Sequence, residues 1–250
     1  MGDTEHGARE RDCHKQRFAE ESFARESRAR RFYDAIAYGF NQFRGRATVI
    51  SRGRNVLAYG CGDEILAYDL AETAKHVTGI DISDVAIVQA ERVAQERNLH
   101  NVRFHVDNAE DMHIADGSID VVVGARIIQH LDIPKAVGEL RRVLSDDGVA
   151  LFAEPLGHNP VLNWYRDRTP ELRTPDDHPL LVRDLRYMAK EFSSCRVTYF
   201  GLISPLLGLI MRAVRSDRLL TRLVWSIDRL LCRIPGLRRY AWYCYCELRV

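Results

Sequence analysis

The sequence predicts an α/β protein whose core is a doubly wound sheet with mainly parallel strands. Between residues 54 and 155, short apolar runs typical of buried strands alternate with stretches that have the apolar periodicity of helices. Three of these runs end in glycine or aspartate, at the point where the strands of such a sheet bind ligands. The 250 residues are enough for one such domain with added segments, and no internal repeat is present.

The first predicted element is a helix over residues 16–43, where aromatic residues recur among charged ones. Tyr33, Tyr38 and Phe40 are candidates for a lid over a ligand. Ordinary packing of an N-terminal helix on the core is the alternative interpretation of the same three residues.

The first predicted strand, residues 54–59, leads directly into a glycine turn. Tyr59-Gly60-Cys61-Gly62 is followed by a helix that begins at Ile65. Glycines at such a turn let the backbone approach a ligand closely. The dinucleotide-binding fingerprint needs a small residue where Ile65 stands, and a P-loop needs Lys followed by Ser or Thr. The turn therefore fits neither of those two sites.

The next two predicted strands, residues 77–80 and 102–106, end in acidic residues. Asp81 follows the glycine turn by about twenty residues, a spacing at which a carboxylate binds ribose hydroxyls. Ser83 can cap the helix that follows, to about residue 98. Polar groups of the segment that begins at Asp107, on the same sheet edge, can hydrogen-bond an adenine amino group. These features predict an adenosine-containing ligand at the carboxyl ends of the strands.

The fourth and fifth strands are predicted over residues 119–123 and 149–153. The fourth is wholly apolar, as a central parallel strand should be. A helix opens at Pro134 between them, and Asp147-Gly148 predicts a turn. Glu154 ends the fifth strand and is a candidate for substrate contact. Residues 155–180, rich in Pro, Asp, Arg and His, are predicted to be irregular.

Taken in order, these motifs resemble the class I S-adenosylmethionine-dependent methyltransferases. Val56 to Glu64 looks like the first motif of that family, with Ala58 where the family usually has an acid and Glu64 where it often has glycine. The segment from Gly124 to Asp132, which ends in His130-Leu131-Asp132, is similar to a second family motif, a His-rich helical turn followed by Leu-x-Asp after the fourth strand. The resemblance covers roughly residues 50–155.

The resemblance implies a Rossmann-like, doubly wound, seven-stranded sheet with an antiparallel final strand. Residues 196–200 and 241–250 would be the last two strands, paired antiparallel at the sheet edge. We expect a helical extension or lid over residues 1–50 and a methyltransferase domain over 51–250, with substrate insertions at about 155–190 and 202–239. The implied cofactor is S-adenosylmethionine, with S-adenosylhomocysteine as product. The implied cofactor-binding residues are Tyr59, Gly60, Cys61, Gly62, Asp81, Ile82, Asp107, Asn108, Ala109 and Arg126.

Methyl transfer from a sulfonium is a direct displacement, so the enzyme must mainly align the reacting atoms. A general base is needed only where the acceptor must lose a proton, and His or a carboxylate most often serves. The candidate bases are His130, His158, Asp177 and His178. His130 is also explained as a helix-start residue, and the others as residues of a polar loop. Arg166, Arg168 and Arg173 are candidates to bind a carboxylate or phosphate, with a solvated loop as the alternative.

Net charge is +1, but residues 201–250 carry +6 and the first 200 residues carry −5. Leucines recur at helical spacing between residues 206 and 239, among arginines. This segment would contact a membrane surface or a lipid-like acceptor, or would pack in the core or in a homodimer. The longest apolar run is shorter than the ~20 residues that span a bilayer, and no signal segment is apparent, so a cytoplasmic protein is expected. The six cysteines lack zinc-ligand spacing, so no metal is expected.

We therefore expect a biosynthetic O- or C-methyltransferase that acts on a small-molecule or lipid-linked acceptor. The fourth strand is followed by Gly124-Ala125-Arg126-Ile127, not by the Asn/Asp-Pro-Pro-aromatic motif of enzymes that methylate base amino groups. No RNA-binding module is apparent, so nucleic acid is disfavoured as a partner. A protein or RNA methyltransferase stays open as an alternative. An inactive cofactor-binding scaffold, motivated by Ala58 and Glu64, is the other.

Overall fold

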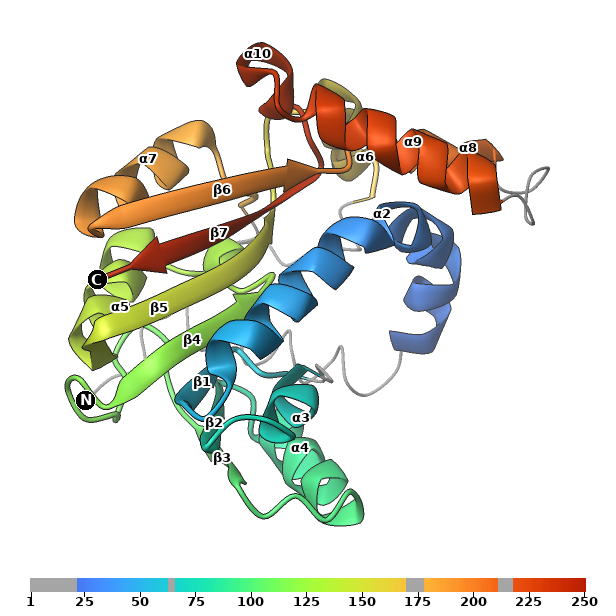
Figure 1. Ribbon diagram of the computed structural model, residues 1–250. Helices are drawn as coiled ribbons and strands as arrows, with labels where there is room; N and C mark the ends of the chain where they lie inside the picture. Colours follow the sequence, from blue (N-terminus) through green and yellow to red (C-terminus); the bar gives the residue numbers. More distant parts are fainter. Residues whose placement is uncertain (1–21, 63–65, 170–177, 211–217) are drawn as a thin grey trace.

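The computed structural model describes residues 22–62, 66–169, 178–210 and 218–250. Seven strands form one sheet in the order β3-β2-β1-β4-β5-β7-β6 (Figure 1). The strands are β1 (Asn55–Tyr59), β2 (His76–Asp81), β3 (Val102–Val106), β4 (Ile119–Ala125), β5 (Leu144–Pro155), β6 (Ser194–Phe200) and β7 (Tyr243–Arg249). The helices are α2 (Ser22–Ser51), α3 (Leu66–Ala71), α4 (Asp84–Glu96), the short 3₁₀ helix η1 (Ile128–His130), α5 (Ile133–Val143), α6 (Pro160–Asp167), α7 (Val182–Glu191), α8 (Pro205–Ile210), α9 (Arg218–Leu231) and α10 (Pro235–Arg238).

The first five strands are parallel, and β7 lies antiparallel between β5 and β6. Strand order reverses between β1 and β4, because the chain first adds β2 and β3 on one side of β1 and then crosses to the other. In open α/β sheets, ligands bind outside the carboxyl ends of the strands at such a reversal. The predicted seven-stranded sheet with an antiparallel final strand is confirmed.

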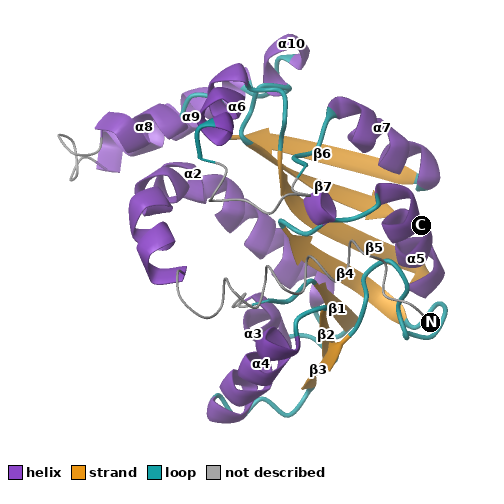
Figure 2. Cartoon of the chain, turned by 180° about the vertical axis from the view of Figure 1, so that it is seen from behind, coloured by secondary structure: helices purple, strands orange, loops and turns teal. Residues whose placement is uncertain are grey.

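Helices cover both faces of the sheet, because successive side chains of a strand point to opposite sides. In β1, Val56 and Ala58 pack with α2, α3 and α4, whereas Leu57 and Tyr59 pack with α5 and α7. Figure 1 shows the first three helices in front of the sheet, and Figure 2 shows α5 and α7 from behind. The two apolar layers fix the sheet between them.

The N-terminal helix is longer than predicted, since α2 continues past residue 43 to Ser51. Phe43, Ala47 and Ile50 are buried against the sheet, so this half of the helix belongs to the core. Burial of an apolar stripe stabilises a helix more than residue propensity does, which explains the extension. The lid role of residues 1–50 stays a prediction.

Two further differences concern the region after β4. The predicted turn at Asp147-Gly148 lies inside β5, where the register against β4 shifts between Ile119 and Val121. Residues 155–180, predicted to be irregular, contain α6, and α7 follows it unpredicted. Asn159 caps α6 by accepting hydrogen bonds from the backbone of Val161 and Leu162, and Pro160 stands at its first turn. Both are ordinary helix-start signals.

The segment between β6 and β7 leaves the sheet and returns to the same place. The backbone nitrogen of Trp242 donates to the oxygen of Gly201 at 3.0 Å, which closes the excursion. Within it, the predicted helical pattern forms α8, α9 and α10. Asp228 of α9 is fully buried and accepts hydrogen bonds from the hydroxyl of Tyr38 and from three backbone nitrogens, those of Gly201, Ile203 and Ser204.

Among the described residues, no helix is both long enough and apolar enough to cross a membrane.

Candidate functional site

The glycine turn after β1 lies against the ends of both neighbouring strands. Gly60 has φ +65°, and a Cβ built on it would lie 2.6 Å from the side chain of Ile127, which follows β4. Both facts favour glycine, because other residues rarely adopt this φ. The backbone nitrogen of Cys61 donates to the oxygen of Ile80 at 2.8 Å. The turn is therefore held at the reversal point of the sheet.

Asp81 joins this turn to the start of α4. One carboxylate oxygen accepts a hydrogen bond from the nitrogen of Gly62 and the other from the nitrogen of Ser83, both at 2.9 Å. The side chain is almost buried. A carboxylate oxygen has room for a second donor, so Asp81 can still accept hydrogen bonds from hydroxyl groups. Ile82, the next residue, is half-buried.

Asp107 lies beside Asp81, because its backbone nitrogen donates to the carbonyl oxygen of Asp81 at 3.0 Å. Its carboxylate accepts hydrogen bonds from the backbone nitrogens of Asn108 and His113, each at 2.9 Å. The ring of His113 lies 3.0 Å from the same carboxylate, and this hydrogen bond raises the pKa of His113. Sequence reasoning missed His113, since no pattern links it to Asp107.

Tyr59 connects β1 to the loop after β3. Its ring is buried, and its hydroxyl donates to the carbonyl oxygen of Ala109 at 2.6 Å. Burial raises the pKa of Tyr59 well above its ordinary value, so the phenol stays neutral. The side chain therefore holds the loop that carries Asp107, Asn108 and Ala109 in place against the end of β1.

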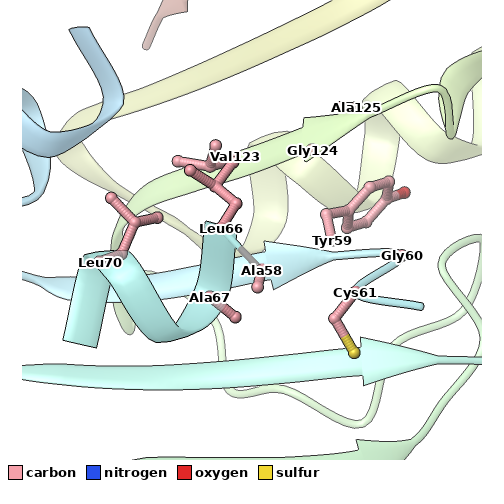
Figure 3. A pocket seen from close by; sticks show the side chains of 10 residues that line it. All are labelled: Ala58, Tyr59, Gly60, Cys61, Leu66, Ala67, Leu70, Val123, Gly124 and Ala125. Carbon is pink, nitrogen blue, oxygen red and sulfur yellow. The ribbon is translucent and has the colours of Figure 1, made fainter. Parts of the chain in front are cut away.

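A small cavity lies under the glycine turn, between α3 and the ends of β1 and β4 (Figure 3). Figure 3 shows Leu66 and Ala67 of α3 beside Ala58 and Val123. Its volume of about 10 Å³ suits roughly one water molecule. A nucleoside does not fit there, so the candidate ligand site is the outer edge formed by the turn, Asp81 and Asp107. Glu64 and Ile65 lie outside the described residues.

On the other side of the reversal point, Glu154 is buried beneath the loop that follows β4. One oxygen accepts hydrogen bonds from the nitrogens of Ile127 and Ile128 at 3.0 Å. Its second oxygen has no hydrogen-bond partner within the described ranges. Burial raises the pKa of Glu154 to about 8, and the backbone nitrogens of Ile128, Ile127 and Gln129 and the charge of Arg126 only partly oppose the shift.

The cofactor candidate Arg126 leads this loop with φ +58°, and its nitrogen donates to the oxygen of Ala153 at 2.9 Å. A guanidinium nitrogen of Arg166 in α6 donates to the oxygen of Leu156 at 3.1 Å. Tyr243 of β7 pairs with Pro155 of β5, which lies between Ala153 and Leu156 in the chain. Burial and a hydrogen bond with Tyr33 raise the pKa of Tyr243, while the charges of Arg126 and Arg166 oppose the shift. Tyr33 and Tyr243 therefore lie near the end of β5, within reach of the charges of Arg126 and Arg166.

The predicted bases lie near this same end. His130 is buried on η1, with its Nε2 3.0 Å from the side-chain nitrogen of Gln129. His158 accepts a hydrogen bond at Nε2 from the nitrogen of Val182 at 2.9 Å, which caps α7. His178 is exposed, and its backbone nitrogen donates to the oxygen of Gln129 at 3.0 Å.

These contacts give His130 and His158 structural partners at Nε2. Asp177 and Arg173 lie outside the described residues. In the described part of the chain, no group of three or more His, Cys, Asp or Glu side chains is arranged to hold a metal ion.

The sequence profile of a methyltransferase-domain family matches residues 50–177, just over half of the chain. Among curated proteins, the uncharacterized methyltransferase YcgJ of Bacillus subtilis is 31% identical over 122 residues, which cover 48% of this chain and 48% of that protein. A ubiquinone biosynthesis O-methyltransferase of Acinetobacter baumannii is 28% identical over 109 residues, 43% of this chain and 46% of that protein. The chain thus matches about half the length of these relatives.

Solved structures match over more of the chain. The crystal structure of YcgJ covers 84% of this chain and 96% of its own, with a TM-score of 0.56 and 20% identity. Geranyl diphosphate C-methyltransferase of Streptomyces coelicolor covers 82% and 75%, with a TM-score of 0.57 and 16% identity. At these identities the likeness concerns the fold.

Proposed function

We propose that this chain, which belongs to the methyltransferase-domain family, transfers a methyl group from S-adenosylmethionine to a small apolar acceptor. The observation that carries the proposal is the contact of three strand ends at the reversal point. There Asp81 joins the glycine turn of β1 to the start of α4, and the backbone of Asp107 bonds to Asp81. This arrangement suits a nucleoside, whose ribose and base require polar groups on neighbouring strands.

The cofactor would lie across this edge. Asp81 would accept hydrogen bonds from the ribose hydroxyls, and the segment Asp107 to Ala109 would contact the adenine. The glycine turn, Gly60 to Gly62, would let the backbone approach the remainder of the molecule. When bound, S-adenosylmethionine supplies an electrophilic methyl group on sulfur. The contribution of the protein is then to hold the acceptor in line with that methyl group and to exclude water.

The acceptor would lie toward the end of β5, where Arg126 and Arg166 flank Tyr33 and Tyr243. Guanidinium groups suit a phosphate or carboxylate, and the tyrosine rings suit an apolar body. Two relatives support this substrate class by their names, a geranyl diphosphate C-methyltransferase and a ubiquinone biosynthesis O-methyltransferase. We therefore favour an acceptor with an apolar chain and an anionic or phenolic head group.

A phenolic acceptor would require a base, and His178 is the best placed of the predicted candidates. His178 is exposed beside η1, whereas His130 is buried and His158 is half-buried. Asp177 stays a candidate from its place in the sequence alone. The N-terminal part of α2, with Tyr33, would close over the acceptor as the lid that the family resemblance implies.

Calorimetric titration tests the cofactor site. We expect the parent protein to bind S-adenosylmethionine and S-adenosylhomocysteine at micromolar concentrations. Asp81→Ala should weaken binding by roughly 10- to 100-fold, because a hydrogen bond to a charged group contributes about 1.5–3 kcal/mol. Asp84→Ala is the matched control, since Asp84 is exposed on the next helix and carries the same charge. No binding by the parent protein would indicate the inactive scaffold.

Activity on a panel of prenylated phenols and isoprenoid diphosphates tests the acceptor. His178→Ala should lower turnover on a phenol and leave cofactor affinity close to that of the parent. Turnover on an isoprenoid carboxylate, included in the same panel, should change little, because an ionised carboxylate has no proton to lose when it is methylated. Equal loss with both acceptor types would contradict a role for His178 as a base.

A further inference from the structure

The apolar stripe of α9 faces solvent. Its residues recur every three or four positions, as on one side of a helix. Their exposed fractions are 76% for Leu219, 57% for Leu223, 41% for Ile227 and 62% for Leu230, and Ile234 beyond the helix end is 46% exposed. Isolated exposed leucines are common on proteins, but a continuous stripe of them indicates an interaction surface.

The orientation of this stripe is fixed by the opposite side of α9. Asp228 is buried and accepts its four hydrogen bonds there, and Cys232 is buried one turn later. The indole nitrogen of Trp225 donates to the oxygen of Ala35 in α2 at 2.7 Å. Rotation of the helix to bury its leucines would break these bonds. The buried side of α9 therefore keeps the apolar stripe on the solvent side of the helix.

Arginines follow one border of the stripe. Each residue of an α-helix is rotated by about 100° from the one before, which places Arg222 and Arg229 between the packed side and the leucines, and Arg233 follows just beyond the helix end. All three are exposed. Asp228 is the one acidic residue between positions 218 and 240, and it is turned inward. This border therefore carries positive charge that no acid of its own segment offsets.

A second helix at the same end of the sheet, α6, also exposes apolar residues. Val161, Trp164 and Tyr165 of α6 are exposed at 71%, 56% and 52%. The side chain of Asn159, at the start of α6, donates to the oxygen of Tyr240 at 2.7 Å, just after α10. Figure 2 shows α6, α9 and α10 gathered at one end of the sheet. Tryptophan and tyrosine are residues that favour the boundary between lipid and water.

We propose that α9, together with α6, docks this protein on an anionic lipid bilayer. The leucines and Trp164 would enter the boundary between head groups and acyl chains, and Arg222, Arg229 and Arg233 would contact lipid phosphates. An amphipathic helix with a basic border lies in the plane of such a surface. The proposal is independent of methyl transfer, because none of these side chains belongs to the candidate cofactor site.

A second copy of the chain fits this surface less well. In a two-fold symmetric dimer, the same patch of each copy faces the other. If the two α9 helices pack antiparallel, the arginine borders lie on the same side and approach each other, with no exposed acid on α9 to pair with them. Interface cores also tend to exclude charged residues. A bilayer that contains anionic lipids removes this repulsion.

Cosedimentation with vesicles tests the proposal. The parent protein should bind vesicles of phosphatidylcholine with phosphatidylglycerol at low salt, and bind poorly to phosphatidylcholine alone. Replacement of Arg222, Arg229 and Arg233 by Gln should weaken binding roughly 100-fold, at about 1 kcal/mol for each arginine near an anionic surface. Leu223→Ser with Leu230→Ser should also weaken binding, and the loss should persist at high salt.

The matched control replaces three exposed arginines elsewhere, Arg52, Arg103 and Arg186, by Gln. This triple variant removes the same charge and should bind almost as well as the parent. Equal losses for the two triple variants would overturn the proposal, as would absence of binding to anionic vesicles. So would a stable dimer that the Leu223→Ser, Leu230→Ser variant converts to monomer, because the leucines would then face a second copy. Circular dichroism of each variant confirms that the fold is retained.

Discussion

Glu154 offers a test in which burial of one carboxyl group sets how stability depends on pH. The folded chain holds the pKa of Glu154 at about 8, against an ordinary value of 4.5. Below pH 4.5 Glu154 is protonated in both the folded and the unfolded chain, so its titration does not change the free energy of unfolding there. Between pH 4.5 and 8 the unfolded chain releases the proton and the folded chain keeps it. Stability is therefore lost as the pH rises through this window.

The size of the loss follows from the shift. At about 1.4 kcal/mol for each pKa unit, a move from 4.5 to about 8 corresponds to on the order of 5 kcal/mol as an upper bound. Glu154→Gln removes the titration and keeps an oxygen that accepts from Ile127 and Ile128. Its amide nitrogen replaces the oxygen that has no hydrogen-bond partner in the described residues. The variant should match the parent near pH 4.5 and exceed its stability by several kcal/mol at pH 8.5.

Urea unfolding at intervals from pH 4.5 to 8.5 measures this difference. Glu247→Gln is the control, because hydrogen bonds from Arg46 and Arg249 lower the pKa of Glu247 to about 2. The stability that Glu247 contributes is present above pH 4.5 and is lost as the pH falls toward 2, so this variant should stay at a constant offset from the parent over the measured range. If the Glu154→Gln curve also runs parallel to that of the parent, Glu154 does not titrate in this window and the reasoning is refuted.

Two other predictions concern buried contacts. Asp228→Ala should lower the free energy of unfolding by about 3–5 kcal/mol in urea, because four donors lose their acceptor. Tyr38→Phe removes one of the four donors and should cost only about 1 kcal/mol, so equal losses would argue against the network. Gly124→Ala would place a Cβ 2.9 Å from the oxygen of Tyr59, and the displaced strand end should lower the melting temperature and cofactor affinity together. Retention of both properties would show that the strand ends adjust freely.

The central part of the fold could be predicted because each strand is a short apolar run that is followed by glycine or by polar residues. Val56 and Ala58 face one side of the sheet and Leu57 faces the other, so an apolar run supplies both faces. The glycine turn and Asp81 mark the ligand edge. The fold places the predicted cofactor residues at that edge, and their binding role stays a prediction. The helix at Pro160 differs from the predicted irregular segment despite its capping signals, because the surrounding Pro, Asp, Arg and His residues have the composition of a loop.

Contacts between distant segments could not be predicted. Glu154 looks like an ordinary strand-end acid, and its altered pKa depends on the loop from Arg126 to Ile128 that the fold lays over it. The periodicity of α9 reveals an apolar stripe, but a single sequence does not tell which side its neighbours cover. Asp228 settles that question only through backbone nitrogens of the β6–α8 connection, about twenty-five residues earlier in the chain.

The excursion between β6 and β7 also has the properties of an exchangeable cassette. Its ends, Gly201 and Trp242, are hydrogen-bonded neighbours, so a short hairpin turn would join the same two strands without a change in their pairing. Replacement of the whole segment by such a turn would leave the strand pairing and the cofactor edge in place. Removal would take away the partners of the Tyr38 hydroxyl, the Ala35 oxygen and the Asn159 side chain. Docking specificity and methyl-donor recognition can thus evolve at separate rates in one chain.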